Sequence, residues 1–219
     1  MKVLRLKIDL HVHSNYSHDS IMTPKELVYY SKKNGLDGVA ITDHGRIDGA
    51  VKIAAETDFL IIPGMEIYSA DGHIIALDVK EPVRKGMKAD ETVDQIHDNG
   101  GIAVACHPAS FFVRSLSINI DAKFDAIETI NASSVPFKYS TKQAQKLAVR
   151  LGASQVAGTD AHYGPELGFA YTLVESENKT DEIIRAVKAG RCQPFGRPIP
   201  WTLRLQKILL SARHSISEQ

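Results

Sequence analysis

The sequence predicts an α/β fold, a single TIM-like barrel of about seven strand–helix units, written (β/α)7. Short β-rich segments alternate with amphipathic segments, the pattern of a parallel sheet covered by helices. Polar side chains that suit metal ions follow most of the β-rich segments, at the carboxyl ends of strands where barrel enzymes carry their sites. At 219 residues the chain is short for an eight-unit barrel.

The first half of the chain marks its elements clearly. A strand is expected at residues 3–12, and Thr23 with Glu26 forms a capping box that begins a helix. Gly35 ends that helix, as glycine commonly does just after a last helical turn. The remaining elements are a strand at 38–42, a helix at 48–56 and strands at 59–62 and 73–79.

The second half continues the alternation. Helices are expected at 90–98 and 180–189, each followed by a glycine. A further helix is expected to open at Ser140 and to close at Gly152. The strands expected here are 102–106, 124–130, 154–158 and, more briefly, 173–174.

The C-terminal part, residues 191–219, is expected to be a loop followed by a helix. Residues 191–200 contain three prolines and one glycine, which favours a loop. Four large apolar side chains then share one helical face: Trp201, Leu205, Ile208 and Leu209. We expect this helix to pack on the barrel, so that residues 1–219 form one domain. A dimer contact or a helix on a membrane surface is the alternative.

The composition argues against several classes of function. Lys plus Arg and Asp plus Glu are both 26, so no excess positive charge is available for long duplex nucleic acid or an anionic membrane. No apolar run approaches the roughly 18 residues that cross a bilayer, and the first residues lack the pattern of a signal peptide. The two cysteines do not suggest a disulfide framework. A cytoplasmic location is therefore expected.

Six of the nine histidines belong to a set of nine residues that suit metal coordination. The set is His11, His13, Asp19, His44, Glu66, His73, His107, Asp160 and His162. His11 and His13, like Asp160 and His162, lie two residues apart, which puts their side chains on one face of an extended strand. So many polar groups in one barrel mouth would be costly to desolvate without a cation.

Imidazole and carboxylate ligands without thiolate suit zinc, manganese or iron. Cys106 directly precedes His107 in a predicted strand, so its side chain is expected to face away from His107 and to pack in the core. The sequence therefore predicts two to three divalent ions of one of these kinds.

Seven short motifs together resemble the polymerase and histidinol phosphatase (PHP) domain family. They occur in the family's order between residues 7 and 165. The motifs are Asp9-Leu-His11-Val-His13-Ser14, Ser17-His-Asp19-Ser20, Ile41-Thr42-Asp43-His44, Gly64-Met-Glu66, Gly72-His73, His107-Pro108 and Gly158-Thr-Asp160-Ala-His162. The resemblance implies a distorted seven-stranded barrel with three metal ions.

The resemblance also implies how the nine residues divide into three ligand sets. The sets are His11, His13, Glu66 and Asp160; Glu66, His73 and His107; and Asp19, His44 and His162. Asp9 and Asp43 are expected to orient ligands from behind the site, as carboxylates commonly do for metal-bound histidines. His18 adjoins Asp19 and is the alternative ligand in that loop.

The expected chemistry is hydrolysis of a phosphate ester by a metal-activated hydroxide, with Glu66, Asp160 and His44 as catalytic residues. The expected substrate is a small phosphomonoester or a short nucleotide. The candidate substrate contacts are Arg46, Arg114, Asn131 and Arg197. The alternatives are an exonuclease that acts on single-stranded ends and a non-catalytic binding subunit.

Overall fold

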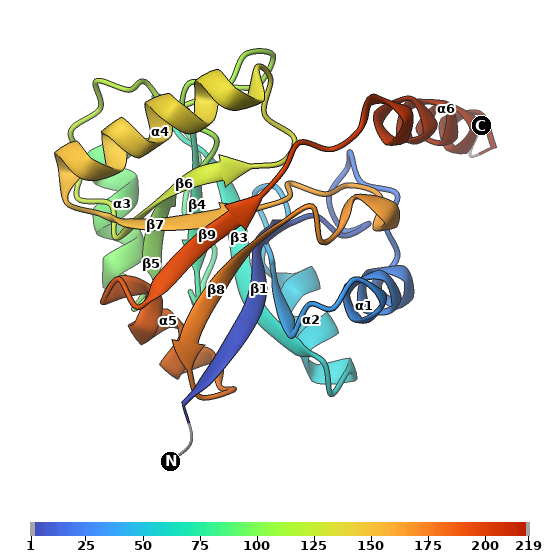
Figure 1. Cartoon of the computed structure of the whole chain (residues 1–219), viewed down its shortest axis with the longest axis horizontal. Coiled ribbons are helices and arrows are strands. Elements are labelled where there is room, and N and C mark those ends of the chain that lie inside the picture. The colour runs from blue at the N-terminus through green and yellow to red at the C-terminus, as the bar shows by residue number, and fades with distance from the viewer. Residues whose placement is uncertain (1–2, 218–219) are drawn as a thin grey trace.

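The computed structural model describes the backbone of residues 3–217 and the side chains of residues 3–212. Within that part of the chain, nine strands form one curved sheet that nearly closes on itself (Figure 1). The strands are β1 (Leu4–Val12), β2 (Gly38–Ile41), β3 (Leu60–Tyr68), β4 (His73–Leu77), β5 (Ile102–Ala105), β6 (Ala126–Asn131), β7 (Ser154–Gly158), β8 (Ala170–Ser176) and β9 (Cys192–Gly196). Hydrogen-bonded neighbours follow in the order β7-β6-β5-β4-β3-β2-β1-β8-β9.

Helices connect many of the strands. They are α1 (Pro24–Lys33), α2 (Asp48–Glu56), α3 (Ala89–Asp98), α4 (Phe137–Leu151), α5 (Thr180–Lys188), α6 (Trp201–Ser217) and the short 3-10 helix η1 (Gly164–Glu166). The predicted capping box begins α1, because the Thr23 hydroxyl accepts the Glu26 N–H and the Glu26 carboxylate accepts the Thr23 N–H. None of the described helices is both long enough and apolar enough to cross a bilayer.

The barrel closes where β1 meets the segment that follows β7. The Asp160 N–H donates to the His11 carbonyl at 2.8 Å, and the His13 N–H donates to the Ala161 carbonyl at 2.9 Å. At the other end of β1, β8 pairs antiparallel with residues 4–8 and carries β9 on its far side. Strands β1 to β7 thus form a distorted TIM-like barrel, which confirms the predicted α/β fold.

Strand β4 runs against its neighbours. It pairs antiparallel with both β3 and β5, whereas β1–β2–β3 and β5–β6–β7 pair parallel. No helix separates β3 from β4. His73 is the first residue of β4 and faces Tyr68 at the end of β3. A strand that starts at this edge therefore contributes to the same mouth as the parallel strands that end there.

The prediction for β3 was wrong at its carboxyl end, because the strand continues from residue 62 to Tyr68. Pro63 and Gly64 lie where the pairing of β3 passes from β2 to β4, since Pro63 faces Ile41 and Gly64 faces Leu77. A side chain at Gly64 would meet the Ala76 carbonyl at 2.7 Å, so this position requires glycine. Residues typical of a strand end thus mark a change of partner within one strand.

Two further boundaries differ from prediction. Helix α4 begins at Phe137, and Ser140 is buried inside it, where its hydroxyl donates to the Ala109 carbonyl at 3.1 Å. The predicted loop at 191–200 contains β9, in which Pro194 faces Thr172 of β8. Strand β9 is an edge strand, where a residue without an N–H is tolerated.

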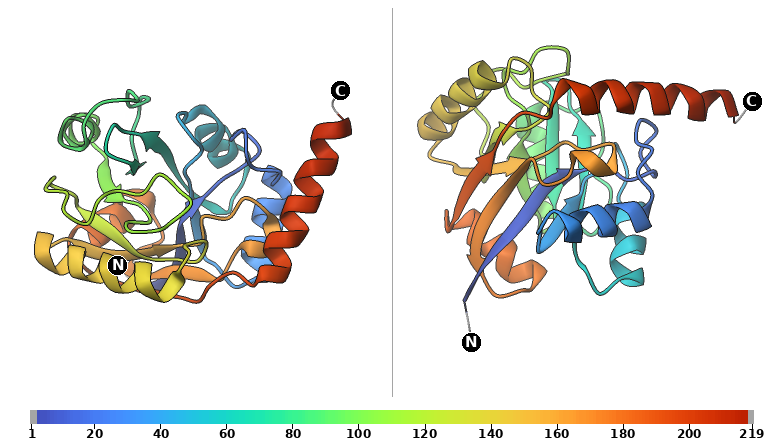
Figure 2. Two further views of the ribbon diagram at one scale, coloured as in Figure 1. Left: turned by 90° about the horizontal axis from the view of Figure 1, so that it is seen from above. Right: turned by 45° about the vertical axis from the view of Figure 1, so that its right-hand side comes forward.

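The first turns of the C-terminal helix α6 contact the barrel. Figure 2 shows α6 projecting beyond the sheet. Leu203 packs near Ile199, and Arg204 donates to the Ser133 and Ala132 carbonyls at 3.0 Å each. The predicted apolar face is exposed instead of packed, with exposed fractions of 69% at Trp201, 59% at Leu205, 61% at Ile208 and 63% at Leu209.

Asp125 links three elements at the opposite end of the barrel. Its carboxylate accepts the Ala103 N–H of β5 at 2.9 Å and the His97 imidazole of α3 at 2.7 Å, and it pairs with Lys188 of α5 at 3.1 Å. Burial raises the pKa of Asp125, but these three partners lower it more, so the net pKa lies below the ordinary 3.8.

Replacement of Asp125 by Asn should therefore destabilise the fold by about 2 kcal/mol at neutral pH. A carboxyl group with a depressed pKa stabilises the fold above its unfolded pKa and loses that effect as pH falls through the folded value. The difference in unfolding free energy between wild type and Asp125→Asn should shrink below about pH 4. Denaturant unfolding at several pH values measures this, and a difference that grows with acidity would contradict it.

Candidate metal centre

The structure brings all nine predicted residues to one mouth of the barrel. The residues come from β1 and the loop after it (His11, His13 and Asp19), from the ends of β2, β3 and β5 (His44, Glu66 and His107), from the start of β4 (His73) and from the segment after β7 (Asp160 and His162). Most of them are buried, and Asp19 is the most exposed, with 37% of its side chain accessible.

Four of these side chains direct one donor atom each at a common point. The set is His11, His13, Glu66 and Asp160. The two imidazole Nε2 atoms lie 3.1 Å apart, and each lies 3.2–3.5 Å from Glu66 Oε2 and Asp160 Oδ1. Ligands of a tetrahedral ion with bonds of about 2.0–2.1 Å lie about 3.3–3.4 Å from one another. The spacing therefore fits an ion the size of zinc.

Glu66 connects this group to a second one through its other oxygen. Glu66 Oε1 lies 2.8 Å from His73 Nδ1 and 3.0 Å from His107 Nε2. The carboxylate is almost fully buried, with 2% of the side chain accessible. A single carboxylate thus faces two groups of donors, the arrangement of a ligand that bridges two ions.

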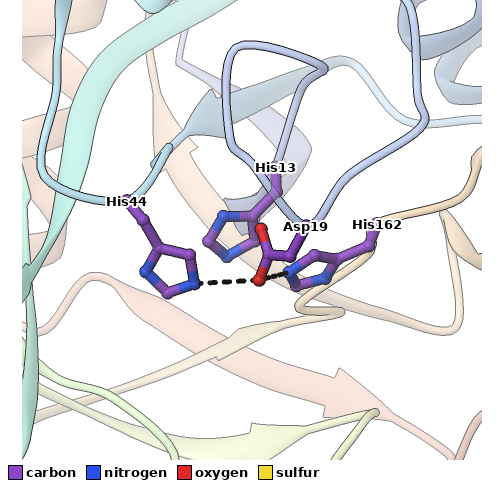
Figure 3. Close-up of side chains that lie close together, drawn as sticks. All are labelled: His13, Asp19, His44 and His162. Atoms are coloured by element: carbon purple, nitrogen blue, oxygen red, sulfur yellow. Dashed lines mark hydrogen bonds and ion pairs between the residues drawn. The ribbon is translucent and has the colours of Figure 1, made fainter. Parts of the chain in front are cut away.

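The third group lies nearer the solvent, with 37% of the Asp19 side chain accessible. Figure 3 shows Asp19 between His44 and His162. Asp19 Oδ2 lies 3.3 Å from His44 Nε2 and 3.1 Å from His162 Nε2, and the His13 ring stacks on His162 at 4.1 Å. His18 is exposed, with its ring 5.7 Å from the ring of His44. Of the two neighbouring loop residues, the structure places Asp19 among the other donors.

Cys106 does not face away from the site, contrary to prediction. Its Sγ lies 3.4 Å from Glu66 Oε1, close to His107. The expected alternation of side chains fails because β5 ends at Ala105 and His107 has a left-handed φ of 33°. Burial raises the pKa of the Cys106 thiol well above 9.0, and the nearby Glu66 carboxylate adds to this effect. Without a bound ion, the thiol therefore stays protonated near neutral pH.

The charges of the site oppose the effect of burial. Burial raises the pKa of Glu66 and Asp160, but the surrounding histidines lower it more, so both pKa values lie well below the ordinary range. Burial lowers the pKa of His11 and His107, but the carboxylates raise it above 6.5. These opposite shifts show that the site favours ionised carboxylates and added positive charge, which a divalent ion also provides.

Glu128 supports the site and was not predicted. Its carboxylate faces His11 Nδ1 at 3.1 Å, accepts the His107 N–H at 2.8 Å and accepts the Asn131 amide at 3.0 Å. A proton on His11 Nδ1, donated to Glu128, leaves the Nε2 lone pair free to bind a metal ion. The available signal in the sequence was a charged residue inside the apolar strand β6.

Asp9 and Asp43 lie behind the site and accept main-chain N–H groups, including that of His11 at 3.3 Å, and they do not contact the imidazole rings. Asp9 accepts the Thr159 N–H at 2.9 Å and so joins β1 to the end of β7. Asp43 accepts the Ser14 N–H at 2.7 Å and the Ser14 hydroxyl at 2.6 Å. Burial raises the pKa of Asp9 to about 7, although the bonds from Thr159 oppose this shift.

The four predicted substrate contacts have partners within the protein. Arg46 pairs with Asp48 at 2.6 Å, Arg114 donates to the Ala70 carbonyl at 3.2 Å, and Arg197 lies over the Phe169 ring at 4.8 Å. Asn131 is buried and donates to Glu128 and, at 3.4 Å, to Asp160. The pocket beside Asp160 and His162 is lined by two cations that were not predicted, Arg204 and Lys207.

Comparisons with known proteins agree with these observations. The sequence model of the PHP domain matches residues 9–211. An uncharacterized protein of Methanocaldococcus jannaschii is 36% identical over 141 residues, which are 58% of this chain and 82% of that protein. An error-prone DNA polymerase of Mycobacterium bovis is 43% identical over 63 residues, 27% of this chain and only 6% of the polymerase.

Among solved structures, a two-domain protein from Bacteroides vulgatus that contains a predicted PHP-like metal-dependent phosphoesterase superposes with a TM-score of 0.73. The match covers 89% of this chain and 66% of that chain at 17% identity, so it shows a shared fold.

Replacement of Glu128 by Gln should weaken metal binding, because the uncharged amide holds His11 less firmly in the metal-binding tautomer. The expected loss of affinity is about 10–100-fold. Competition with a chromophoric chelator measures this affinity. Glu175→Gln, a change at an exposed carboxylate that pairs with Arg5, is the matched control. Equal affinity in the Glu128→Gln variant and the control would refute the role of Glu128.

The loop ligand can be tested in the same way. Asp19→Ala should lower the number of bound ions and the activity, whereas His18→Ala should change either by less than about twofold, as for a surface substitution. Elemental analysis of both folded variants decides between the residues. The opposite ranking would assign the ligand to His18.

Proposed function

The chain belongs to the PHP domain family, and on this basis we propose that it is a metal-dependent phosphoesterase for small phosphomonoesters or short nucleotides. The observation that supports this function most strongly is the position of Glu66. Its two oxygens face two different groups of donors within 2.8–3.4 Å. Ions held by the two groups would put positive charge on more than one side of a bound ester phosphate.

We infer two to three divalent ions, of zinc, manganese or iron. The residues that would hold them are His11, His13, Glu66 and Asp160 for the first; Glu66, His73 and His107 for the second; and Asp19, His44 and His162 for the third. When bound, such ions supply a water of lowered pKa and positive charge for the phosphoryl oxygens.

The protein groups have separate tasks in this reaction. Glu66 and Asp160 remain ionised because the histidines depress their pKa. Glu128 fixes the tautomer of His11 through a 3.1 Å contact. Cys106 lies 3.4 Å from Glu66 Oε1, beside the donors of the second group. His44 faces both Glu66 and Asp19 at 3.3 Å, so it lies between the buried and the exposed parts of the site.

The proposed substrate is small because the chain carries no excess positive charge, with 26 basic and 26 acidic residues. Binding should depend on a few contacts to one phosphate and respond only modestly to salt, unlike binding that neutralises many backbone phosphates. The two cysteines are unpaired, which is consistent with the cytoplasmic location that we propose.

Glu66→Gln and Asp160→Asn should each reduce the hydrolysis of phosphomonoesters by more than the 10–100-fold typical of residues behind a metal ligand. The loss of a negative ligand weakens metal binding and raises the pKa of the bound water. The assay uses metal-loaded protein with a panel of phosphomonoesters, phosphodiesters and short oligonucleotides, and circular dichroism checks the fold. Glu175→Gln is the control.

Near-normal turnover in a folded, metal-replete Glu66→Gln variant would overturn the role of Glu66. Wild-type protein that binds two or more ions and hydrolyses nothing in the panel would favour a non-catalytic binding subunit. Much faster cleavage of long nucleic acids than of any small ester would favour the exonuclease.

A further inference from the structure

A pocket of about 330 Å³ opens beside the metal centre, and we call it the α6 pocket. Its floor includes Asp160 and His162, which belong to two of the candidate ligand groups. Its walls are the loop at residues 111–113 and the first turns of α6. The volume lies at the lower end of the range for small-molecule sites, so the pocket has room for one small chemical group.

The loop wall of the α6 pocket is held in place. The Phe111 N–H donates to the Val135 carbonyl at 2.8 Å, and the Ser110 hydroxyl accepts the Val135 N–H at 3.3 Å. These contacts present Phe111 and Phe112 with exposed fractions of 52% and 91%. Phe112 also has a left-handed φ of 62°, which is unusual for a bulky residue and is often found at binding sites.

The α6 wall is held through polar contacts. Arg204 donates to the Ala132, Ser133 and Ile199 carbonyls at 3.0–3.2 Å. Lys207 lies 3.5 Å from the buried Glu166, whose other oxygen accepts the His162 N–H at 3.0 Å. The orientation of α6 is therefore connected to the main chain of a candidate metal ligand.

The two walls share one chemical character. Trp201, 69% exposed, lies on the α6 side, and Phe111 and Phe112 lie on the loop side. Three accessible aromatic rings in one pocket next to a metal centre are costly to leave in water and suit a flat apolar partner. The Arg204 guanidinium lies 5.3 Å from the centre of the Trp201 ring and adds positive charge to the same wall.

From this pocket we infer that the preferred substrate is a phosphomonoester whose leaving group carries a planar aromatic ring. The inference rests on the proposed function, which puts the phosphate at the metal centre. The ring stacks on Trp201 and on the loop aromatics, and the polar edge of the leaving group faces Arg204 and Lys207. Two sources supply this chemistry, a nucleobase and a phenyl ring.

Trp201 is the only tryptophan of the chain, so its fluorescence reports directly on the α6 pocket. Phosphonates resist hydrolysis, so they test binding without turnover. The aromatic probes are the phosphonate analogue of AMP and benzylphosphonate. The matched probes without a ring are the phosphonate analogue of ribose 5-phosphate and ethylphosphonate. The aromatic probes should change Trp201 fluorescence and bind about tenfold more tightly, as expected for one stacked ring.

The aromatic probe that binds more tightly shows whether the ring of the substrate is a nucleobase or a phenyl ring. Phe112→Ala should reduce the preference for the aromatic probe over its ring-free partner several-fold. Leu209→Ala is the control, because Leu209 is exposed on the same helix and lies outside the α6 pocket. In turnover assays, Trp201→Ala should lower kcat/KM for the aromatic ester more than kcat/KM for glycerol phosphate, whereas Leu209→Ala should change neither.

Equal affinity for aromatic and ring-free probes, with no change in fluorescence, would overturn the inference. Hydrolysis of both classes of ester at similar rates would leave the phosphoesterase function intact in that case. Conversely, aromatic phosphonates that bind to a metal-loaded protein without any phosphatase activity would support the α6 pocket and refute the proposed function.

Discussion

The seam between β1 and the segment after β7 holds the metal centre together. Main-chain bonds between His11 and Asp160, and between His13 and Ala161, align two segments that are far apart in the sequence. Asp9 adds a side-chain bond to Thr159 across the same seam. A slip of one residue in this register would turn donor side chains away from the mouth, because neighbouring residues of a strand face opposite sides.

Burial controls the electrostatics of the centre. Glu66 is almost fully buried, with 2% of its side chain accessible, whereas Asp19 at the rim has 37%. Ionised carboxylates persist at this depth only because imidazoles and, when present, metal ions compensate their charge. The negative charges of the buried carboxylates raise the pKa of His11 and His107, and the same charges attract divalent ions to the site.

Helix α6 extends the site beyond the barrel. Its sequence is amphipathic, yet its apolar face does not cover the sheet. Its first turns instead use Arg204 and Lys207 to bind backbone carbonyls and the buried Glu166. Helix α6, which carries none of the candidate ligands, thus adds Trp201, Arg204 and Lys207 to the pocket beside Asp160 and His162.

The sequence by itself determined the α/β class, most element positions and the nine residues that meet at the mouth. Local signals carry this information, such as the capping box at Thr23 and the spacing of His11 and His13. The tertiary structure alone decided the reversed direction of β4, the length of β3 and the position of Cys106. These features depend on strand pairing and on the left-handed backbone at His107, which no local pattern encodes.

The predicted substrate contacts also show the difference between local sequence signals and tertiary structure. Arg46 and Arg114 were predicted from their positions near motifs and Arg197 from the C-terminal loop. Arg46 pairs with the local Asp48, but Arg114 and Arg197 meet Ala70 and Phe169, which only the folded chain brings near them. Glu128 and Arg204 act across long sequence separations, from Glu128 on β6 to His11 and from Arg204 on α6 to Ser133. Periodicity predicts which face of an element is apolar, but the fold decides which groups that face meets, because those groups come from distant segments.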